Sequence, residues 1–265
     1  MMRFAPVVPI EVAQAMQEDE ILGNYHLLLA HDVQARSKEY REVYHKISYP
    51  TIIMDNSVIE LGEPVDAPVM VHAIESVYTD EGVYIVVLPD ALMDGEATME
   101  RIRVAFNEWA KDIQKIFPSV QFMGVPQGKD VQEWVRCVED LSHYEEITWL
   151  GIPRNFREKL TGTRIQAVQI AHMIKPTWQM HLLGFSDDLH DDMTTCHLSS
   201  RFNYPVQGID SAVPIRTAMR ERMHISFSYS THNPRGDWWE NPGDYASTSH
   251  IVKANIKRIN TWIKS

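Results

Sequence analysis

The sequence alternates short apolar runs, rich in β-branched and large side chains, with longer stretches of helical spacing. This pattern is typical of repeated units of one strand and one helix. The runs are nearly continuous in apolar residues, as expected for parallel strands that are covered on both faces. We predict eight strands: Tyr25–Ala30, Thr51–Met54, Val83–Leu88, Val120–Gly124, Ile147–Gly151, Gln179–Gly184, Val206–Ile209 and His224–Tyr229.

The stretches between the runs predict helices. Met99–Ile116 carries one apolar stripe, and Asp130–Leu141 and Thr163–Ile174 repeat its spacing. The segment Thr231–Ser249 is rich in Pro, Gly, Asn and Asp and is predicted to be a loop. Eight parallel strands that alternate with helices within 265 residues match the α/β class and the (β/α)8 TIM barrel, as one domain over residues 1–265. An open doubly wound sheet is the alternative, but the chain lacks its glycine-rich phosphate-binding motif.

Cysteine content and hydropathy indicate the compartment. No apolar run reaches the roughly 20 residues that a membrane helix needs, and the start of the chain lacks a signal-peptide pattern. The two cysteines, Cys137 and Cys196, form no CxxC pair, which fits a reducing cytoplasm and no zinc ribbon. We therefore expect a cytoplasmic protein with no membrane partner, no metal and no cofactor.

The net charge of −11 argues against a non-specific coat on nucleic acid. The charge is uneven, because residues 1–200 hold 16 Lys and Arg against 31 Asp and Glu, whereas residues 201–265 hold 9 against 5. The last quarter of the chain is thus suited to meet phosphate groups. An ordinary cationic last helix explains the same excess equally well.

Polar residues follow the predicted strands, at the end of the barrel where enzymes of this fold carry out their chemistry. Three carboxylates, Asp55, Asp90 and Asp210, are expected to face one pocket there. Mutual repulsion and partial burial would separate their pKa values and permit acid, base and nucleophile roles, as in the cleavage of glycosidic bonds. Each aspartate alone is explained as well by a cap on the helix that follows.

Five short segments lie at predicted strand ends. They are Ile53–Gly62 (IMDNSVIELG), Gly124–Gly128 (GVPQG), Leu150–Arg154 (LGIPR), His181–Asp192 (HLLGFSDDLHDD) and Gly208–Met219 (GIDSAVPIRTAM). In this order they resemble segments of the tRNA-guanine transglycosylases. In the last segment an Asp is followed by a small residue, a short apolar stretch and Pro-x-Arg, similar to the family's segment with the nucleophilic aspartate.

The resemblance implies base exchange by a pentosyltransferase. Guanine is expelled from a nucleic-acid sugar, the sugar is held covalently on an aspartate, and a 7-deazaguanine base is installed. The resemblance implies that Asp210 is the nucleophile and Asp55 the general acid or base. The implied substrate-binding residues are Asp90, Gln127, Gly128, Gly151, Ile152 and Gly184.

The chain departs from the tRNA enzymes in two ways. Their zinc module, three cysteines and a histidine after the nucleophile, is absent because no cysteine follows Cys196. Asp-Asn-Ser-Val-Ile also stands where the family has Asp-Ser-Gly-Gly-Phe. These departures favour a similarity to compact, phage-type 7-deazaguanine DNA transglycosylases, which would act in the host cytoplasm. Contacts with nucleic acid are then expected from Arg216, Arg235, Trp238 and Trp239, the tryptophans either stacking on bases or covering an apolar surface.

Three other functions stay open. The chain is alternatively a tRNA-guanine transglycosylase, a glycosyl transferase or hydrolase of a free nucleoside or nucleotide, or a non-catalytic partner subunit. The three aspartates argue against the last, and the acidic composition suits the free nucleoside. We expect His31 to be bonded to a neighbouring loop, and Ser186–Asp192 to be a solvated acidic turn, not a metal site.

Overall fold

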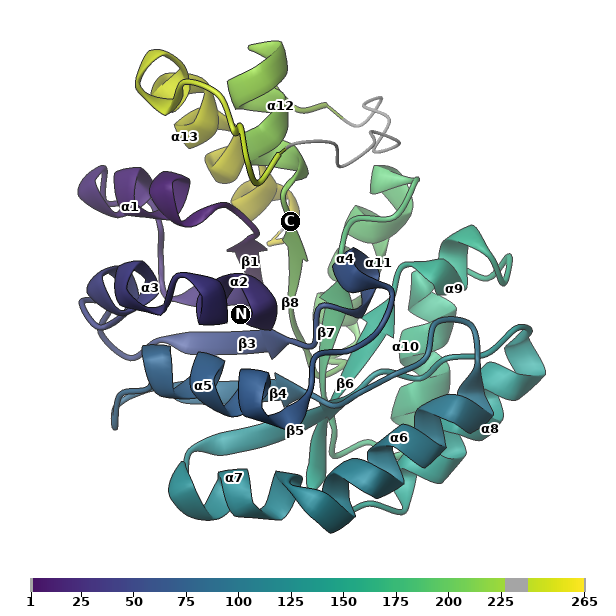
Figure 1. Ribbon diagram of the computed structural model, residues 1–265. Helices are drawn as coiled ribbons and strands as arrows, with labels where there is room; N and C mark the ends of the chain where they lie inside the picture. The colour runs from purple at the N-terminus through teal and green to yellow at the C-terminus, as the bar shows by residue number, and fades with distance from the viewer. Residues whose placement is uncertain (1, 227–237, 265) are drawn as a thin grey trace.

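The computed structural model describes residues 2–226 and 238–264. Its eight strands form one parallel sheet, hydrogen-bonded in the order β1-β8-β7-β6-β5-β4-β3-β2. The two end strands contact each other, so the sheet curves into a nearly closed barrel with helices around it (Figure 1). The α/β class and the (β/α)8 TIM barrel are therefore confirmed.

The strands are β1 (Arg3–Pro6), β2 (Tyr25–Leu29), β3 (Thr51–Asp55), β4 (Val83–Val87), β5 (Val120–Gly124), β6 (Ile147–Pro153), β7 (Gln179–Leu183) and β8 (Val206–Ser211). The helices of the first half are α1 (Ile10–Glu18), α2 (Ala30–Ala35), α3 (Ser37–Tyr44), α4 (Val58–Leu61), α5 (Ala67–Val77), α6 (Gly95–Glu108) and α7 (Ala110–Ile116). Those of the second half are α8 (Val131–Ser142), α9 (Asn155–Glu158), α10 (Arg164–Ile174), α11 (Leu189–Arg201), α12 (Val213–Glu221) and α13 (Tyr245–Trp262).

Alternate side chains of each strand enter two different cores. Leu27 and Leu29 of β2 pack inside the barrel, together with Ile53 of β3. Leu28 and Ile52 point the other way and pack between the sheet and the helices. Both faces of the sheet are thus apolar and buried, which explains why the strands read as continuous apolar runs.

The first seven predicted strands are correct, but they are the second to the eighth strands of the barrel. The chain's first strand is β1, which was not predicted, and it pairs with β8 from Arg3 opposite Gly208 to Pro6 opposite Ser211. The predicted eighth strand is wrong where it can be checked, because residues 224–226 form no strand. Residues 227–229 lie outside the described part. Asp210 therefore belongs to the eighth strand of the barrel, next to the first.

The helix predictions hold with two corrections. Asp130 caps α8, and Thr163 forms a capping box with Gln166 at the start of α10. The stretch Met99–Ile116 is not one helix, since the backbone leaves helical geometry at Trp109 and separates α6 from α7. The predicted loop Thr231–Ser249 is too long, because α13 begins at Tyr245 under the cap of Asp244.

The last two helices, α12 and α13, pack on each other beside β1 and β8 (Figure 1). Buried Asn255 of α13 joins them, because its amide donates to the carbonyl of Pro214 at 2.8 Å and accepts the N–H of Ile225 at 3.0 Å. α12 begins directly after β8 and so stands at the carboxyl ends of the strands. Among the helices in the described ranges, none is long and apolar enough to cross a membrane.

Candidate active site

The carboxyl ends of the strands surround a cavity of about 550 Å³. This volume lies in the range of pockets that enclose small ligands. Predicted site residues from six segments that are distant in sequence line it: Asp55, Asp90, Gln127, Gly184, Asp210, Arg216, Trp238 and Trp239. The structure thus places both predicted catalytic aspartates in one cavity, although their chemical roles stay predictions.

Asp55 ends β3 and is partly open to the cavity. Its Oδ2 accepts the backbone N–H of Ser57 at 2.8 Å, in the turn before α4. Burial and the nearby charge of Glu60 raise the pKa of the Asp55 carboxyl well above its usual range, and the charges of Asp90 and Asp210 act in the same direction. Asp55 is therefore suited to carry a proton at the edge of the cavity.

Asp90 is held by two side-chain amides. Its Oδ1 accepts from Asn56 at 2.7 Å and its Oδ2 from Gln127 at 2.6 Å. Gln127 is held in turn, because its Oε1 accepts the amide N–H of Asn155 at 2.9 Å. Burial raises the pKa of Asp90, whereas the two amide donors lower it. The four side chains form one hydrogen-bonded network, and this network fixes the orientation of the Asp90 carboxylate.

Asp210 lies on β8 and is only 6 % exposed. Its Oδ1 accepts the backbone N–H of Gly184 at 2.9 Å and stands 3.0 Å from Nε2 of His181. The alternative that Asp210 caps the next helix is wrong, because the N-cap of α12 is Ala212 and the side chain that bonds Val213 N–H is that of Ser211. The carboxylate is directed to His181 of the neighbouring strand β7 instead.

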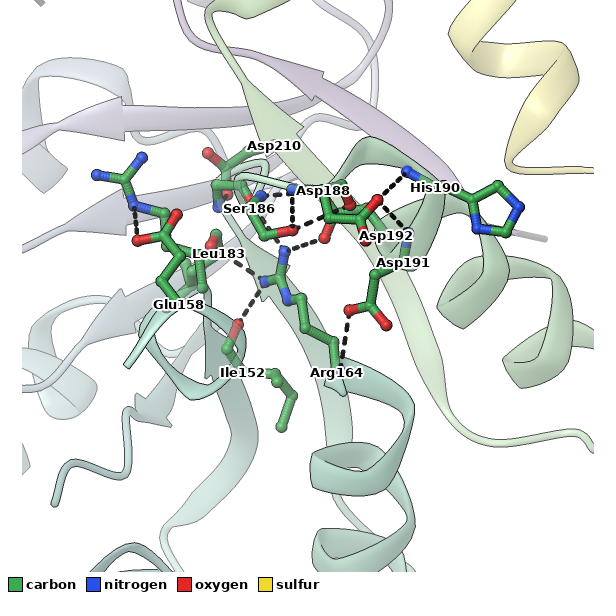
Figure 2. Close-up of polar contacts among 12 residues, drawn as sticks. Ile152, Glu158, Arg164, Leu183, Ser186, Asp188, His190, Asp191, Asp192 and Asp210 are labelled. Carbon is green, nitrogen blue, oxygen red and sulfur yellow. Dashed lines mark hydrogen bonds and ion pairs between the residues drawn. The ribbon is translucent and has the colours of Figure 1, made fainter. Parts of the chain in front are cut away.

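Buried Arg164 of α10 shapes the backbone that meets Asp210 (Figure 2). Its guanidinium donates to the carbonyl oxygens of Ile152 and Gly184, both at 2.6 Å, and pairs with Asp192 at 2.9 Å. The backbone of Gly184 adopts φ +66°, a left-handed conformation that glycine takes without strain. The N–H of Gly184 thus points toward Asp210, and its carbonyl oxygen points toward Arg164.

Three predicted substrate-binding residues do not line the cavity as far as the described residues show. A Cβ on Gly128 would lie 2.5 Å from the backbone nitrogen of Trp134, and one on Gly151 would lie 2.6 Å from Leu183 Cδ1. Gly128 is needed because backbone atoms lie against it, whereas an added Cβ at Gly151 would displace the flexible ends of neighbouring side chains. The side chain of Ile152 packs in the outer core. The prediction that these three contact the substrate is therefore not supported by their positions.

The two tryptophans both line the cavity but differ in exposure. Trp238 is 2 % exposed and packs in the outer core, with the guanidinium carbon of Arg220 5.8 Å from its ring centroid. Trp239 is half-buried and lines the cavity. The interpretation as a cover for apolar surface thus fits Trp238, whereas Trp239 remains available for stacking. Arg235 lies outside the described residues.

Two other sequence expectations are settled by the structure. His31 lies on α2 and its backbone N–H meets the hydroxyl of Ser57 at 3.5 Å. Nδ1 of its imidazole is buried without a hydrogen-bond partner among the described residues, so the expected side-chain bond to a neighbouring loop is not seen at this nitrogen. The run Ser186–Asp192 is not a solvated turn, because α11 begins within it and Asp192 is buried against Arg164. In the described part of the chain, no group of three or more His, Cys, Asp or Glu side chains is arranged to hold a metal ion.

Sequence reasoning missed four residues that the site uses. Asn56 follows β3 directly, and Asn155 lies two residues beyond the end of β6, so their positions near strand ends are the signal that marks them. Glu60 lies one helical turn beyond β3 and lines the cavity. His181 sits at an inward-facing position of an apolar strand, and the alternation along β7 is the signal that marks it.

No protein-family model matches the chain, and no curated protein matches it. Among solved structures, it is similar to an HpcH/Hpal aldolase/citrate lyase family protein from Burkholderia cenocepacia J2315. That likeness has a TM-score of 0.47 and 10% identity, over 80% of this chain and 87% of that chain. It is also similar to PhdJ bound to a substrate intermediate, with a TM-score of 0.44 and 9% identity over 100% and 76% of the two chains. Likenesses this distant say nothing about the reaction.

Proposed function

We propose that this chain is a pentosyltransferase that replaces guanine in DNA by a 7-deazaguanine base through a covalent aspartyl-sugar intermediate. The observation that carries the proposal is the meeting of Asp55, Asp90 and Asp210 in one cavity, each with a different set of hydrogen-bond donors. Carboxylates in different environments can divide the roles of nucleophile, proton carrier and base-binding group.

In the first step an oxygen of Asp210 bonds to C1′ of the nucleotide while the bond between C1′ and N9 of guanine breaks. The bonding electrons leave with guanine, and Asp55 donates a proton to it. The raised pKa of Asp55, caused chiefly by burial, supports this role as acid. In the second step N9–H of the incoming base loses its proton to Asp55, N9 attacks C1′, and the ester bond to Asp210 breaks. Both carboxyl groups return to their starting states, as in retaining glycosidases.

Asp90 would bind the guanine edge. A carboxylate offers about four lone-pair sites, and the amides of Asn56 and Gln127 use one on each oxygen. The remaining sites can accept N1–H and the exocyclic amine of guanine, two donors that lie side by side. Since adenine has no donor at N1, this geometry would select guanine.

Cations among the residues that line the cavity support a nucleic-acid polymer as the substrate. Arg154 is partly exposed, Lys159 is exposed, and Arg216 is buried at the start of α12. Such groups suit the phosphates on either side of a nucleotide that has been turned out of the stack. DNA is preferred over tRNA because of the missing zinc module.

A free nucleoside is the second candidate. Glu60 and Glu158 add negative charge to the cavity lining, and the whole chain carries −11, which disfavours a polyanion and not a neutral nucleoside.

Base exchange tests both candidates. Purified protein is incubated with radiolabelled guanine and, in separate reactions, duplex DNA, single-stranded DNA, tRNA and deoxyguanosine. We expect label in DNA only, and none with Asp210→Asn. Label in deoxyguanosine alone would establish the second candidate, and label in tRNA alone would establish a tRNA enzyme. Labelling by Asp210→Asn at the wild-type rate would remove Asp210 as the nucleophile.

A further inference from the structure

A buried polar pair lies beneath Asp210 in the barrel interior, among apolar side chains such as those of Leu27 and Ile53. Nε2 of His181 stands 3.0 Å from Asp210 Oδ1, and the hydroxyl of Tyr25 stands 2.6 Å from Nδ1 of the same imidazole. His181 is 0% exposed and Tyr25 is 2% exposed. The three side chains come from β7, β8 and β2 and form one continuous line across the barrel.

The chemistry of the three groups determines where the protons are. A carboxylate only accepts hydrogen bonds, so Nε2 of His181 must carry the proton that faces Asp210. A neutral imidazole has one N–H, so Nδ1 accepts, and the Tyr25 hydroxyl donates to it. Burial lowers the pKa of His181 and raises that of Tyr25, which keeps the imidazole neutral and the phenol protonated.

Charged groups from three elements face this imidazole. Asp210 lies on β8, Arg164 on α10 and Arg3 on β1. The two arginines disfavour a second proton on His181, and Asp210 favours one, but burial is the larger effect. The guanidinium carbon of Arg3 also lies 4.1 Å from the ring centroid of Tyr25 and so holds the phenol from the far side.

The two donors to Asp210 that the described residues provide, His181 Nε2–H and Gly184 N–H, both meet Oδ1. We propose that Tyr25 and His181 are positioning residues that fix Oδ1 of Asp210, so that Oδ2 is the atom presented to C1′ of the substrate. Tyr25 sets the tautomer of His181, and His181 sets the rotation of the carboxylate. The last step of this inference rests on the proposed function, whereas the hydrogen-bond chain itself does not.

Two substitutions of His181 separate positioning from packing. The amide nitrogen of Gln reaches close to the place of Nε2, whereas Asn reaches only the place of Nδ1. His181→Asn should slow formation of the covalent protein–DNA adduct about 100-fold in single turnover, with the Kd for DNA within about twofold, because a misplaced reacting atom costs about this much. His181→Gln should recover at least 10-fold of that loss, and Tyr25→Phe should lose about 10-fold.

His26→Gln is the matched control. His26 is equally buried on β2, but its ring packs edge-on against Tyr44 outside the barrel and makes no contact with Asp210. The His26→Gln variant should form the covalent protein–DNA adduct at the wild-type rate. The positioning role is overturned by wild-type adduct formation in His181→Asn, or by a loss in His181→Gln as large as that in His181→Asn.

A second measurement keeps the hydrogen-bond chain testable if His181→Asn does not fold. Nitrogen-15 NMR of the labelled imidazole should show Nε2 protonated and Nδ1 unprotonated in the wild type, and a mixture of tautomers in Tyr25→Phe. The opposite tautomer in the wild type would overturn the inference. If the wild type forms no adduct with any nucleic acid or nucleoside, the proposed function fails, and the NMR result still decides whether Tyr25 and His181 hold Oδ1 as described.

Discussion

At the scale of single residues, the cavity gives chemically identical aspartates different properties. Asp55 meets one backbone N–H, Asp90 two side-chain amides, and Asp210 an imidazole together with a glycine N–H. The number and kind of donors, together with burial, determine how readily each group holds a proton. Two predictions follow from these surroundings, one for Asp55 and one for Asp90.

Asp55→Asn should stabilise the fold at neutral pH. The folded-state pKa of Asp55 lies above that of the unfolded chain, so its favourable contribution is complete below the unfolded pKa and is lost as the pH rises through the folded pKa. An uncharged amide removes this loss and still accepts from Ser57 N–H. We expect the Tm at pH 7 to rise by roughly 2–4 °C, equivalent to about 1 kcal/mol, and no rise near pH 3.

Differential scanning calorimetry at both pH values measures this effect. Asp66→Asn is the control, because Asp66 caps α5 away from the cavity and its side chain bonds only the N–H of Val69 among the described contacts. An equal rise at both pH values for Asp55→Asn would contradict the assigned cause.

Asp90→Ala should weaken selection between bases and leave the affinity for DNA nearly unchanged. It removes the acceptor proposed for guanine and one hydrogen bond from each of Asn56 and Gln127, whereas Asn56 keeps its bond to the carbonyl of Leu88. We expect kcat/KM for guanine exchange to fall by roughly 100-fold, corresponding to about 3 kcal/mol, with a change of less than twofold in the Kd for DNA. Exchange kinetics and fluorescence anisotropy measure the two quantities.

Asp94→Ala is the comparison for Asp90→Ala. Asp94 caps α6 through the N–H of Ala97, so its loss should cost about 1 kcal/mol of stability without altering base selection. If Asp90→Ala lowers the affinity for every nucleic acid equally, Asp90 does not read the base.

At the scale of elements, Arg164 joins α10, α11 and the ends of β6 and β7 (Figure 2). The side chains of Arg164 and Asp192 are both 0% exposed. Removal of one partner from such a pair leaves a buried charge without compensation, and this is strongly destabilising. Arg164 also donates to the carbonyl of Gly184, whose N–H bonds Asp210. The packing of these elements and the position of Asp210 therefore depend on the same side chain.

Arg164→Met should lower the free energy of unfolding by about 3–5 kcal/mol. The double variant with Asp192→Asn should recover part of that loss, because the uncompensated charge is gone. Arg103→Met should have a much smaller effect on the free energy of unfolding, since the pair of Arg103 and Glu100 is exposed. Urea unfolding measures all three, and a loss for Arg164→Met no larger than that for Arg103→Met would contradict the role assigned to the buried pair.

At the scale of the whole molecule, the proposed function requires an acidic protein to meet a polyanion through a local arrangement of cations. Arg154 and Lys159 line the cavity from the segment around α9, and Arg216 lines it from α12. Their neighbours include Glu158, whose carboxylate lies 3.9 Å from Arg154 Nε. Binding of DNA at this face would release few counterions, so its dependence on salt should be shallow.

The Kd for DNA should rise with salt concentration with a logarithmic slope of about 2 to 3, at about 0.9 for each phosphate contacted. Arg154→Ala should reduce the slope by about 1, and binding of deoxyguanosine, which is uncharged, should not depend on salt. Fluorescence anisotropy between 50 and 200 mM salt, the range over which such effects are large, measures the slope. A slope that Arg154→Ala and Lys159→Ala both leave unchanged would exclude this face as the contact with phosphate.

The order of the seven strands from β2 to β8, the helices that start near Asp130 and Thr163, and the meeting of Asp55, Asp90 and Asp210 were determined by the sequence alone. The physical reason is that each depends on local spacing or on the rule that parallel strands end at the same edge of a sheet. Tertiary structure decided the rest. The four residues of β1 become a strand only because β8 supplies their partners, and Gly128 and Gly151 are packing residues only because Trp134 and Leu183 lie against them. The line from Tyr25 through His181 to Asp210 exists only once the sheet has curved, since only curvature brings β2 across the interior from β7 and β8.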